Sequence, residues 1–432
     1  MKTPTAYLPS LKHLALFLTE CCNLRCDYCY ASSMNNKRTT PETAYAAVDF
    51  LFENAPESTN LHISFWGGEP LLEFALMKEL VNYSRSKAES NRRKITFSFP
   101  TNATLLNEEI LDFTKRNGVS FSLSIDGTLE SQAARKTAGG ENSYYLVGRS
   151  LDLVKAMMGP NLPPIRKTIE PETVGNLAAD VRYFLDGGFS NITFSPVLEK
   201  AWTEERMEEL RRQQICVADL FMAHLLAGQP FHVHLWDEML AMEHFARNGI
   251  LELNGSFPCG AGCYMCAVDV EGDIYPCHRF VLYDKGKRKC MLGSVKAGLR
   301  GERVLAPYRS IDNTVLRNRT TKCKSCAVRR KCLMLCPATN LALTGDIFTN
   351  PTSVCRFRMQ MEEILAYIGK TLNDKDSDKW IAYKNELLPR YHKRPYVKSN
   401  PFHSRAFDRD QIDELSDKAA AILGNIDTRN HG

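Results

Sequence analysis

Four cysteines stand close together near the start of the chain, in the stretch TECCNLRCDYCYA at residues 19–31. Cys22, Cys26 and Cys29 form the spacing C-x3-C-x2-C, and Cys21 directly precedes them. A structural zinc site closes with four ligands, but no histidine lies close downstream, and Cys21 points away from its neighbour in most backbone conformations. Three thiolates on a four-iron cubane instead leave one iron open for a substrate. The spacing therefore favours an iron–sulfur cluster over zinc.

Most of the other cysteines fall in two further groups, at residues 259–277 and 323–355. The N-terminal apolar run is too short for a signal peptide, and no window has the roughly 20 apolar residues of a membrane span. We therefore expect a cytoplasmic protein with reduced thiols and no membrane partner. Clustered thiols in a reducing compartment indicate metal ligands. The net charge of +5 over 432 residues argues against a nucleic-acid partner.

Six β-type runs must position these groups, at residues 13–18, 61–70, 94–103, 119–127, 164–171 and 191–199. Helical patterns separate them, which predicts an α/β fold with parallel strands joined by right-handed crossovers. An open doubly wound sheet would also fit, but regular units without a reversal signal favour a partial (β/α)6 barrel. Active residues of such sheets gather at the carboxyl ends of the strands.

Four polar motifs follow successive strand patterns. They are the cysteine stretch, GGEP at residues 67–70, PTNA at 100–103 and SIDG at 124–127. Because these motifs all follow strands of one parallel sheet, we expect them to meet at one mouth of the barrel.

The cysteine spacing, with an aromatic residue before its last cysteine and GGEP after the second strand, resembles the radical S-adenosylmethionine (SAM) enzymes. The resemblance implies that Gly67, Gly68 and Glu69 contact the methionyl amino group of SAM. It also implies that Asn102 and Ser124 face SAM and that Arg135 meets its carboxylate. The family commonly shows His-Asp shortly before that arginine, whereas Ser131 and Gln132 stand here.

The second half resembles the SPASM domain, the small cysteine-rich module with two auxiliary iron–sulfur clusters found in peptide-modifying radical SAM enzymes. The motifs CKSCAVRRKCLMLC at 323–336 and GDIYPCHRF at 272–280 carry this likeness. The resemblance implies that one auxiliary cluster is held by Cys323, Cys326, Cys332 and Cys355. The other would be held by Cys259, Cys277 and Cys336, with Cys263 favoured over Cys266 or an open iron as its fourth place. The cofactors implied are three [4Fe-4S] clusters and SAM.

By this resemblance the protein is an enzyme that cleaves SAM reductively to a 5′-deoxyadenosyl radical. The radical would abstract hydrogen from a ribosomally made precursor peptide and give a crosslinked or otherwise oxidised residue. Sulfatase maturases carry an aspartate after the YPC cysteine; His278 stands there and could act as a base. Formylglycine formation and a small-molecule SPASM dehydrogenase are alternatives, and an iron–sulfur electron-transfer protein is one of a different class. A zinc-rich binding module, with or without nucleic acid, is disfavoured.

Domain organisation follows from these patterns. We expect a partial barrel at residues 1–202, bridging helices at 203–256, the SPASM region at 257–360 and a helical, polar tail at 361–432. The first cluster cysteine lies at position 22, so we expect no N-terminal leader-recognition domain before it. Leader recognition would then use the barrel mouth, the bridging helices, the C-terminal tail or a separate protein, and we favour the first two. A reductant such as flavodoxin or ferredoxin is the other partner implied.

Overall fold

The structure is a computed structural model that describes residues 11–31, 36–57, 60–248, 259–284, 288–309, 321–326, 328, 332 and 336–391. The chain folds as two compact units. Unit 1 contains residues 1–167, 255–312 and 336–347, and unit 2 contains residues 168–254, 313–335 and 348–432.

Unit 1 is built on a curved sheet in the strand order β13-β12-β11-β10-β1-β3-β4-β5-β7. From β10 to β7 neighbouring strands pair in parallel, whereas β10 to β13 pair antiparallel. The parallel strands are β10 (Met265–Val268), β1 (His13–Thr19), β3 (Leu61–Gly67), β4 (Ile95–Thr101), β5 (Val119–Ser124) and β7 (Ile165–Ile169). The antiparallel strands are β11 (Asp273–Tyr275), β12 (Gly293–Ser294) and β13 (Gly298–Leu299). A separate ribbon pairs β2 (Leu24–Cys26) with β6 (Arg135–Thr137).

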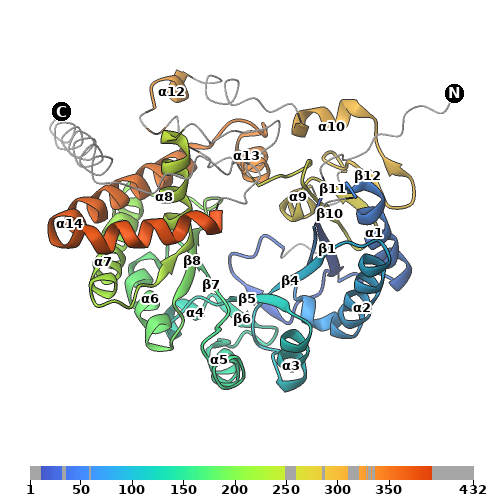
Figure 1. Cartoon of the computed structure of the whole chain (residues 1–432), viewed down its shortest axis with the longest axis horizontal. Helices are drawn as coiled ribbons and strands as arrows, with labels where there is room; N and C mark the ends of the chain where they lie inside the picture. The colour runs from blue at the N-terminus through green and yellow to red at the C-terminus, as the bar shows by residue number, and fades with distance from the viewer. Residues whose placement is uncertain are drawn as a thin grey trace. The chain divides into compact units, whose positions relative to one another are not determined.

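The long helices of unit 1 follow the outer face of this sheet (Figure 1). The long ones are α1 (Pro41–Asn54), α2 (Phe74–Ser90), α3 (Glu108–Arg116) and α5 (Tyr144–Met158). The shorter ones are η1 (Pro70–Glu73), α4 (Leu129–Gln132), α9 (His278–Tyr283), α10 (Glu302–Arg309) and α13 (Pro337–Thr344). Side chains cap the starts of α1 and α3: Thr40 accepts from the backbone of Thr43, and Asn107 from that of Ile110.

The two faces of the strands differ in chemistry. The face toward the helices carries the aromatic core, in which Phe65 stacks on Phe97 at 6.2 Å and Phe99 on Phe121 at 5.6 Å between ring centres. The opposite face carries polar residues, most of them half-buried or exposed: His62, Ser64, Thr96, Ser98, Ser120, Ser122 and Ser124. A closed barrel of this type fills its interior with branched apolar side chains. The polar inner face of unit 1 is therefore suited to contact with a polar ligand or water.

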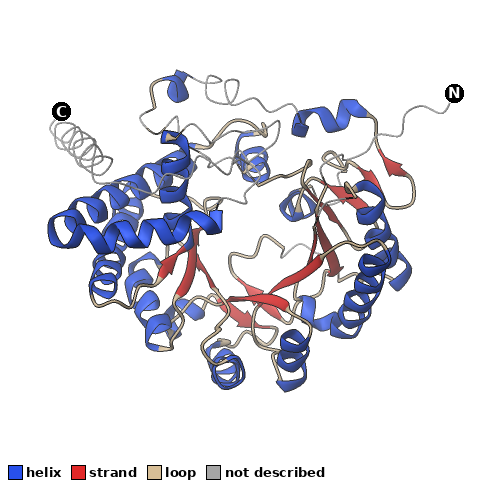
Figure 2. Ribbon diagram, viewed as in Figure 1, coloured by secondary structure: helices blue, strands red, loops and turns tan. Residues whose placement is uncertain are grey.

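Unit 2 begins within β7 and is mainly helical (Figure 2). It contains η2 (Val174–Asn176), α6 (Leu177–Asp186), β8 (Asn191–Pro196), α7 (Glu204–Leu226), β9 (His232–Val233), α8 (His234–Arg247), α12 (Thr321–Lys324) and α14 (Thr352–Tyr391). Strand β8 pairs in parallel with β9, and α14 packs against α7 and α8. Non-helical backbone at Asp376 divides α14 into two helical parts.

The predicted fold class is confirmed: all six predicted β-runs are strands, separated by helices as expected. One feature differs from expectation. The cysteine-rich region contributes β10 to β13, and β10 adds to the sheet directly beside β1. The predicted domain boundaries at 202, 256 and 360 stay predictions, and the predicted tail beyond Tyr391 lies outside the described residues.

Candidate active site

The cysteines of the C-x3-C-x2-C spacing lie together in the loop that follows β1, here called the cysteine loop (residues 20–30). Cys22, Cys26 and Cys29 are half-buried and form no disulfide. The backbone of Leu24 donates to Cys22 Sγ over 3.4 Å, and that of Cys29 to the Cys26 carbonyl over 3.1 Å. Burial raises the pKa of Cys26 to about 12, and the thiols of Cys29 and Cys22 add to the rise. The three thiols therefore lie near enough to affect one another's pKa.

The cysteine loop rests on the turn Gly67–Glu69, here called the glycine turn. The backbone of Gly68 donates to the Thr19 carbonyl over 3.1 Å, and that of Glu69 to the Cys21 carbonyl over 2.9 Å. A Cβ on Gly67 would lie 2.4 Å from the Thr19 oxygen, and one on Gly68 would lie 2.3 Å from the Cys21 oxygen. Only glycine allows this approach, which explains both glycines of the GGEP motif.

The Glu69 side chain holds the glycine turn in place. It is 1% exposed, and its carboxylate accepts from the backbone of Leu71, the hydroxyl of Thr101 and the backbone of Asn102 at 2.8–3.1 Å. Burial raises the pKa of Glu69 to about 7, although these hydrogen bonds act in the opposite direction. Both carboxylate oxygens thus bind donors at the ends of neighbouring strands, while the contact of Glu69 with SAM stays a prediction.

Asn102 connects the end of β4 to the first cysteine. Its amide Nδ2 donates to Asn23 over 2.9 Å and lies 3.8 Å from Cys22 Sγ. Its Oδ1 accepts from the backbone and the hydroxyl of Thr104. Asn102, predicted to face SAM, therefore also orients Cys22 by a hydrogen bond to sulfur.

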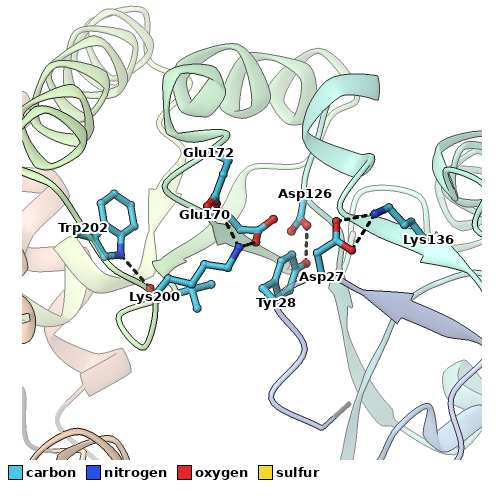
Figure 3. Close-up of polar contacts among 9 residues, drawn as sticks. Asp27, Tyr28, Asp126, Lys136, Glu170, Glu172, Lys200 and Trp202 are labelled. Atoms are coloured by element: carbon cyan, nitrogen blue, oxygen red, sulfur yellow. Dashed lines mark hydrogen bonds and ion pairs between the residues drawn. The ribbon is translucent and has the colours of Figure 1, made fainter. Parts of the chain in front are cut away.

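A buried ion pair joins Asp126, just after the end of β5, to Arg135, one of the residues predicted to contact SAM. Ser124, another of these residues, is the last residue of β5. The Nε of Arg135 donates to Asp126 Oδ2 over 3.0 Å, and the hydroxyl of Tyr28 donates to the same oxygen over 2.5 Å. The side chains of Arg135 and Asp126 are 7% and 2% exposed. Ser124 is half-buried and pairs with Arg166 of β7. Figure 3 shows Tyr28 directed at Asp126, with Asp27 paired to Lys136 beside it.

The thiols of a second group lie near the start of α9. Burial raises the pKa of Cys277 above its ordinary range, and Cys259 and Cys336 add to the rise. Arg279 donates to Cys336 Sγ over 3.7 Å and to Thr339 over 2.7 Å. Three of the predicted ligands of one auxiliary cluster are thus brought together.

The two candidates for its fourth place differ in surroundings. Cys263 is half-buried and close enough to Lys12 to influence the pKa of that ammonium. Cys266 is fully buried within β10 beside Leu14, and burial alone raises the pKa of its thiol. The half-buried thiol of Cys263 is therefore better suited than the fully buried thiol of Cys266 to be the fourth ligand of this auxiliary cluster.

The ligands predicted for the other auxiliary cluster belong to unit 2. Cys323, Cys326, Cys332 and Cys355 are half-buried, and the backbone of Cys326 donates to the Cys323 carbonyl over 3.3 Å. Their joint role stays a prediction.

His278, the predicted base, stacks on Trp66 with ring centres 3.9 Å apart and an angle of 12°. The indole N–H of Trp66 donates to Ser64, whose hydroxyl also bonds His13 over 2.7 Å. Burial lowers the pKa of His278 well below its ordinary value, and Arg166 and Arg279 add to that effect. The imidazole is therefore neutral near pH 7, and a flat aromatic surface holds its ring.

In unit 2 a lysine and two carboxylates lie after the ends of β7 and β8. Lys200 forms ion pairs with Glu170 and Glu172, and the Trp202 indole donates to the Val197 carbonyl over 2.9 Å (Figure 3). Neither this group nor a role for Asp126 and Trp66 was predicted from the sequence. Their positions just after strands or just before GGEP were the available signal.

Residues 16–168 match the family model of the Radical SAM superfamily. The chain therefore contains a radical SAM domain. The matched residues include the cysteine loop, the glycine turn, Asn102 and the Asp126–Arg135 pair, so the geometry described above belongs to that domain.

Three curated relatives are similar to this chain, and two of them carry names that describe a maturation activity. An uncharacterised protein of Methanocaldococcus jannaschii is 34% identical over 185 residues, which are 43% of this chain and 62% of that protein. The cysteine-type anaerobic sulfatase-maturating enzyme of Clostridium perfringens is 24% identical over 288 residues, 64% of this chain and 76% of its own. The mycofactocin maturase MftC of Mycobacterium ulcerans is 27% identical over 62% of this chain and 68% of its own.

The fold agrees with solved structures. The structure of native anSMEcpe with bound AdoMet has a TM-score of 0.67 at 20% identity, covering 84% of this chain and 99% of that one. This likeness reaches beyond the radical SAM domain, and the cysteine-rich second half of the chain is consistent with a SPASM region. Among the helices in the described part of the chain, none combines the length and apolarity needed to cross a membrane.

The residues of the first site fit the iron–sulfur cluster that a radical SAM domain implies. Cys22, Cys26 and Cys29 offer three thiols that influence one another, and Asn102 supplies an N–H beside one sulfur. Hydrogen bonds to sulfur are a means by which proteins tune such clusters. The number of auxiliary clusters stays a prediction.

Proposed function

We propose that this radical SAM enzyme is a peptide maturase that takes a hydrogen atom from a ribosomally made peptide and leaves a crosslinked or otherwise oxidised residue. The observation that carries the proposal is the cysteine loop, in which Cys22, Cys26 and Cys29 rest on the glycine turn, while the thiol of the adjacent Cys21 donates to the Asn36 carbonyl instead. An electron carrier needs neither the turn nor an open coordination place. The cluster held there would supply the electron that divides SAM into methionine and a 5′-deoxyadenosyl radical.

The chain's own residues bind and orient SAM in this proposal. Peptide groups of the glycine turn would meet the methionyl ammonium, and Arg135 would meet the methionyl carboxylate. Arg135 suits this role because Asp126 engages its Nε and holds the guanidinium in one orientation. Asn102 and Ser124, at the ends of β4 and β5, would complete the contacts.

A peptide substrate is favoured by two features. The curated relatives include sulfatase-maturating enzymes and a mycofactocin maturase, and a solved structure of anSMEcpe contains AdoMet together with the Kp18Cys peptide. The inner face of unit 1 carries hydroxyl and imidazole groups on β3, β4 and β5, which can pair with peptide N–H and C=O groups. His278, neutral and held against Trp66, would accept a proton or a hydrogen bond from the substrate.

Two auxiliary clusters would complete the enzyme, held by the cysteines named above in units 1 and 2. The partners we propose are a precursor peptide, a reductant such as flavodoxin or ferredoxin, and a separate leader-recognition protein.

The first test measures 5′-deoxyadenosine release from SAM by anaerobically reconstituted protein with dithionite. We expect release from the wild-type chain and none from the Cys22→Ala, Cys26→Ala, Cys29→Ala triple variant. The matched control is Cys216→Ala, which removes an exposed thiol of α7. Cluster-loaded wild-type protein that releases no more than the triple variant would contradict the proposal and favour an electron-transfer protein.

Formylglycine formation is a second candidate, because the C. perfringens relative is a sulfatase-maturating enzyme. The residue after Cys277 is His278 rather than the aspartate of those maturases, which counts against it. A cysteine-containing sulfatase-type peptide separates the two functions. An aldehyde captured by a hydrazide reagent would support the second candidate, whereas 5′-deoxyadenosine release without aldehyde would support the first.

A further inference from the structure

Asp126 joins two parts of the radical SAM site that are far apart in sequence. Its Oδ2 accepts the hydroxyl of Tyr28, which lies between Cys26 and Cys29, and also the Nε of Arg135. The Arg135 guanidinium lies 5.5 Å from the centre of the Tyr28 ring. One carboxylate oxygen therefore fixes a side chain of the cysteine loop and the arginine predicted to meet SAM.

The backbone around Asp126 is held just as firmly. Its N–H donates to Gln132 over 2.9 Å, and its carbonyl accepts from the buried Lys167 over 2.8 Å. Gln132 in turn donates to Ser143. Asp126 is 1% exposed. A buried carboxylate that is held by partners on this many elements has little freedom to move, so it keeps the side chains bound to it in fixed positions.

A second, exposed ion pair bridges the same two segments. Lys136 of β6 contacts both carboxylate oxygens of Asp27 at 2.9 Å, and these side chains are 43% and 46% exposed. It provides a matched comparison, because it joins the cysteine loop to β6 without burial. Exposed ion pairs contribute little to stability. Removal of one partner of a buried ion pair is strongly destabilising, because the other charge stays buried without compensation.

We propose that Asp126 is a positioning residue that sets the cysteine loop, through Tyr28, and Arg135 in a single arrangement required for SAM binding. The inference rests on the proposed function and assigns a residue that neither the motif resemblance nor the comparisons name. Asp126 need not touch SAM itself. Its effect passes through Tyr28 to the loop that holds Cys26 and Cys29, and through Arg135 to the methionyl carboxylate.

The test compares Asp126→Asn with Asp27→Asn in the full, cluster-loaded chain. The readouts are the dissociation constant for SAM, the change that SAM causes in the electron paramagnetic resonance spectrum of the reduced protein, and the rate at which a chelator removes iron. We expect Asp126→Asn to weaken SAM binding by about tenfold or more and to speed iron removal, as loss of outer support for metal ligands does. Asp27→Asn should stay within about twofold of wild type, as expected of an exposed pair.

SAM binding by Asp126→Asn within twofold of wild type, with unchanged iron release, would overturn the inference. If Asp126→Asn does not fold, Tyr28→Phe decides, because it removes one hydroxyl and keeps the buried ion pair. We expect Tyr28→Phe to weaken SAM binding about threefold, the scale of one lost hydrogen bond, and wild-type binding would overturn the inference.

The two proposals fail differently. The wild-type protein alone reports on the proposed function, through its SAM-dependent spectrum. The role of Asp126 is tested by comparing the variant with the wild type, both in the dissociation constant for SAM and in the rate of iron removal. The rate of iron removal can be compared even if neither protein binds SAM.

Discussion

The backbone N–H of Glu69 donates to the carbonyl oxygen of Cys21 over 2.9 Å. With the bond from Gly68 to Thr19, it attaches the glycine turn to the start of the cysteine loop. The position of Cys22 thus depends on a turn more than forty residues further along the chain. Side chains are excluded from this contact, so the dependence can be tested by adding one methyl group.

Gly68→Ala should disrupt the first metal site. The added Cβ would lie 2.3 Å from the Cys21 oxygen and 2.9 Å from Cys22 Cβ, and backbone rather than a flexible side chain must move. We expect lower iron occupancy of the first site and weaker SAM binding, measured by iron analysis and by the spectrum of the reduced protein. Gly148→Ala is the control: it lies within α5, nothing lies within 4 Å of the new Cβ, and alanine should stabilise the helix by about 0.5–1 kcal/mol. Equal iron content in both variants would contradict the role given to Gly68.

Asn102→Ala should make the cluster at Cys22 harder to reduce. The substitution removes the N–H that lies 3.8 Å from Cys22 Sγ, and loss of a hydrogen bond to sulfur leaves more negative charge on the cluster. We expect the reduction potential to fall by an amount on the order of tens of millivolts, measured by a redox titration followed by electron paramagnetic resonance. Asn142→Ala, whose amide bonds Leu129 instead, should leave the potential unchanged.

Cys263→Ala and Cys266→Ala should differ in iron content. If Cys263 is a ligand of the auxiliary cluster at Cys277, its loss should remove up to about four irons, the content of one cubane. Cys266 lies fully buried in β10, so Cys266→Ala should keep its iron and lose only packing. The measurement is iron per chain after anaerobic reconstitution. Iron loss in Cys266→Ala alone would reverse the assignment.

Lys384→Met should stabilise unit 2 at neutral pH. Lys384 is 1% exposed, lies 5.0 Å from the Trp380 ring, and burial lowers its pKa from 10.5 to about 8. Below pH 8 the folded state contains a buried cation. Between pH 8 and 10.5 the unfolded chain binds more protons than the folded one, so the stability of the wild type rises with pH.

Methionine keeps the length of the side chain without its charge. We expect Lys384→Met to raise the free energy of unfolding at pH 7 by up to about 3 kcal/mol and to remove the rise between pH 8 and 10.5. Melting temperatures at pH 7 and 9.5 test both points. A variant less stable than wild type at pH 7 would show that the interactions of the ammonium with its neighbours outweigh the cost of burying it.

The sequence was sufficient for the main elements of the barrel because their signals are local. Alternating polar and apolar residues on β3 and β5 mark half-buried strands, and Pro41 and Asn107 mark helix starts. The motifs that follow the strands meet as expected, because parallel strands end at a common edge.

Contacts between distant residues were not predictable in the same way. In the sequence, Asp126 is only part of the SIDG motif after a strand, and no local pattern indicates its hydrogen bond with Tyr28, which is 98 positions away. The contact of Glu69 with an ammonium stays a prediction, but its hydrogen bonds from Leu71, Thr101 and Asn102 had no local signal; they form because a buried carboxylate requires donors close by. Strand β10 has only four residues and gives no strong periodic signal.

The parallel pairing of β1 with β10 also has a consequence for how the protein is made. His13 pairs with Met265, and Leu16 with Val268, so one edge of β1 waits for a segment synthesised about 250 residues later. Until then the nascent chain presents an apolar strand with unpaired backbone groups, a template for wrong pairing. In the order of synthesis β10 is the last of the parallel strands of unit 1, so the strand that leads into the cysteine loop is paired on both edges only after the others exist. Pairing with β10 would couple completion of this sheet to readiness of the cysteine loop to receive its metal.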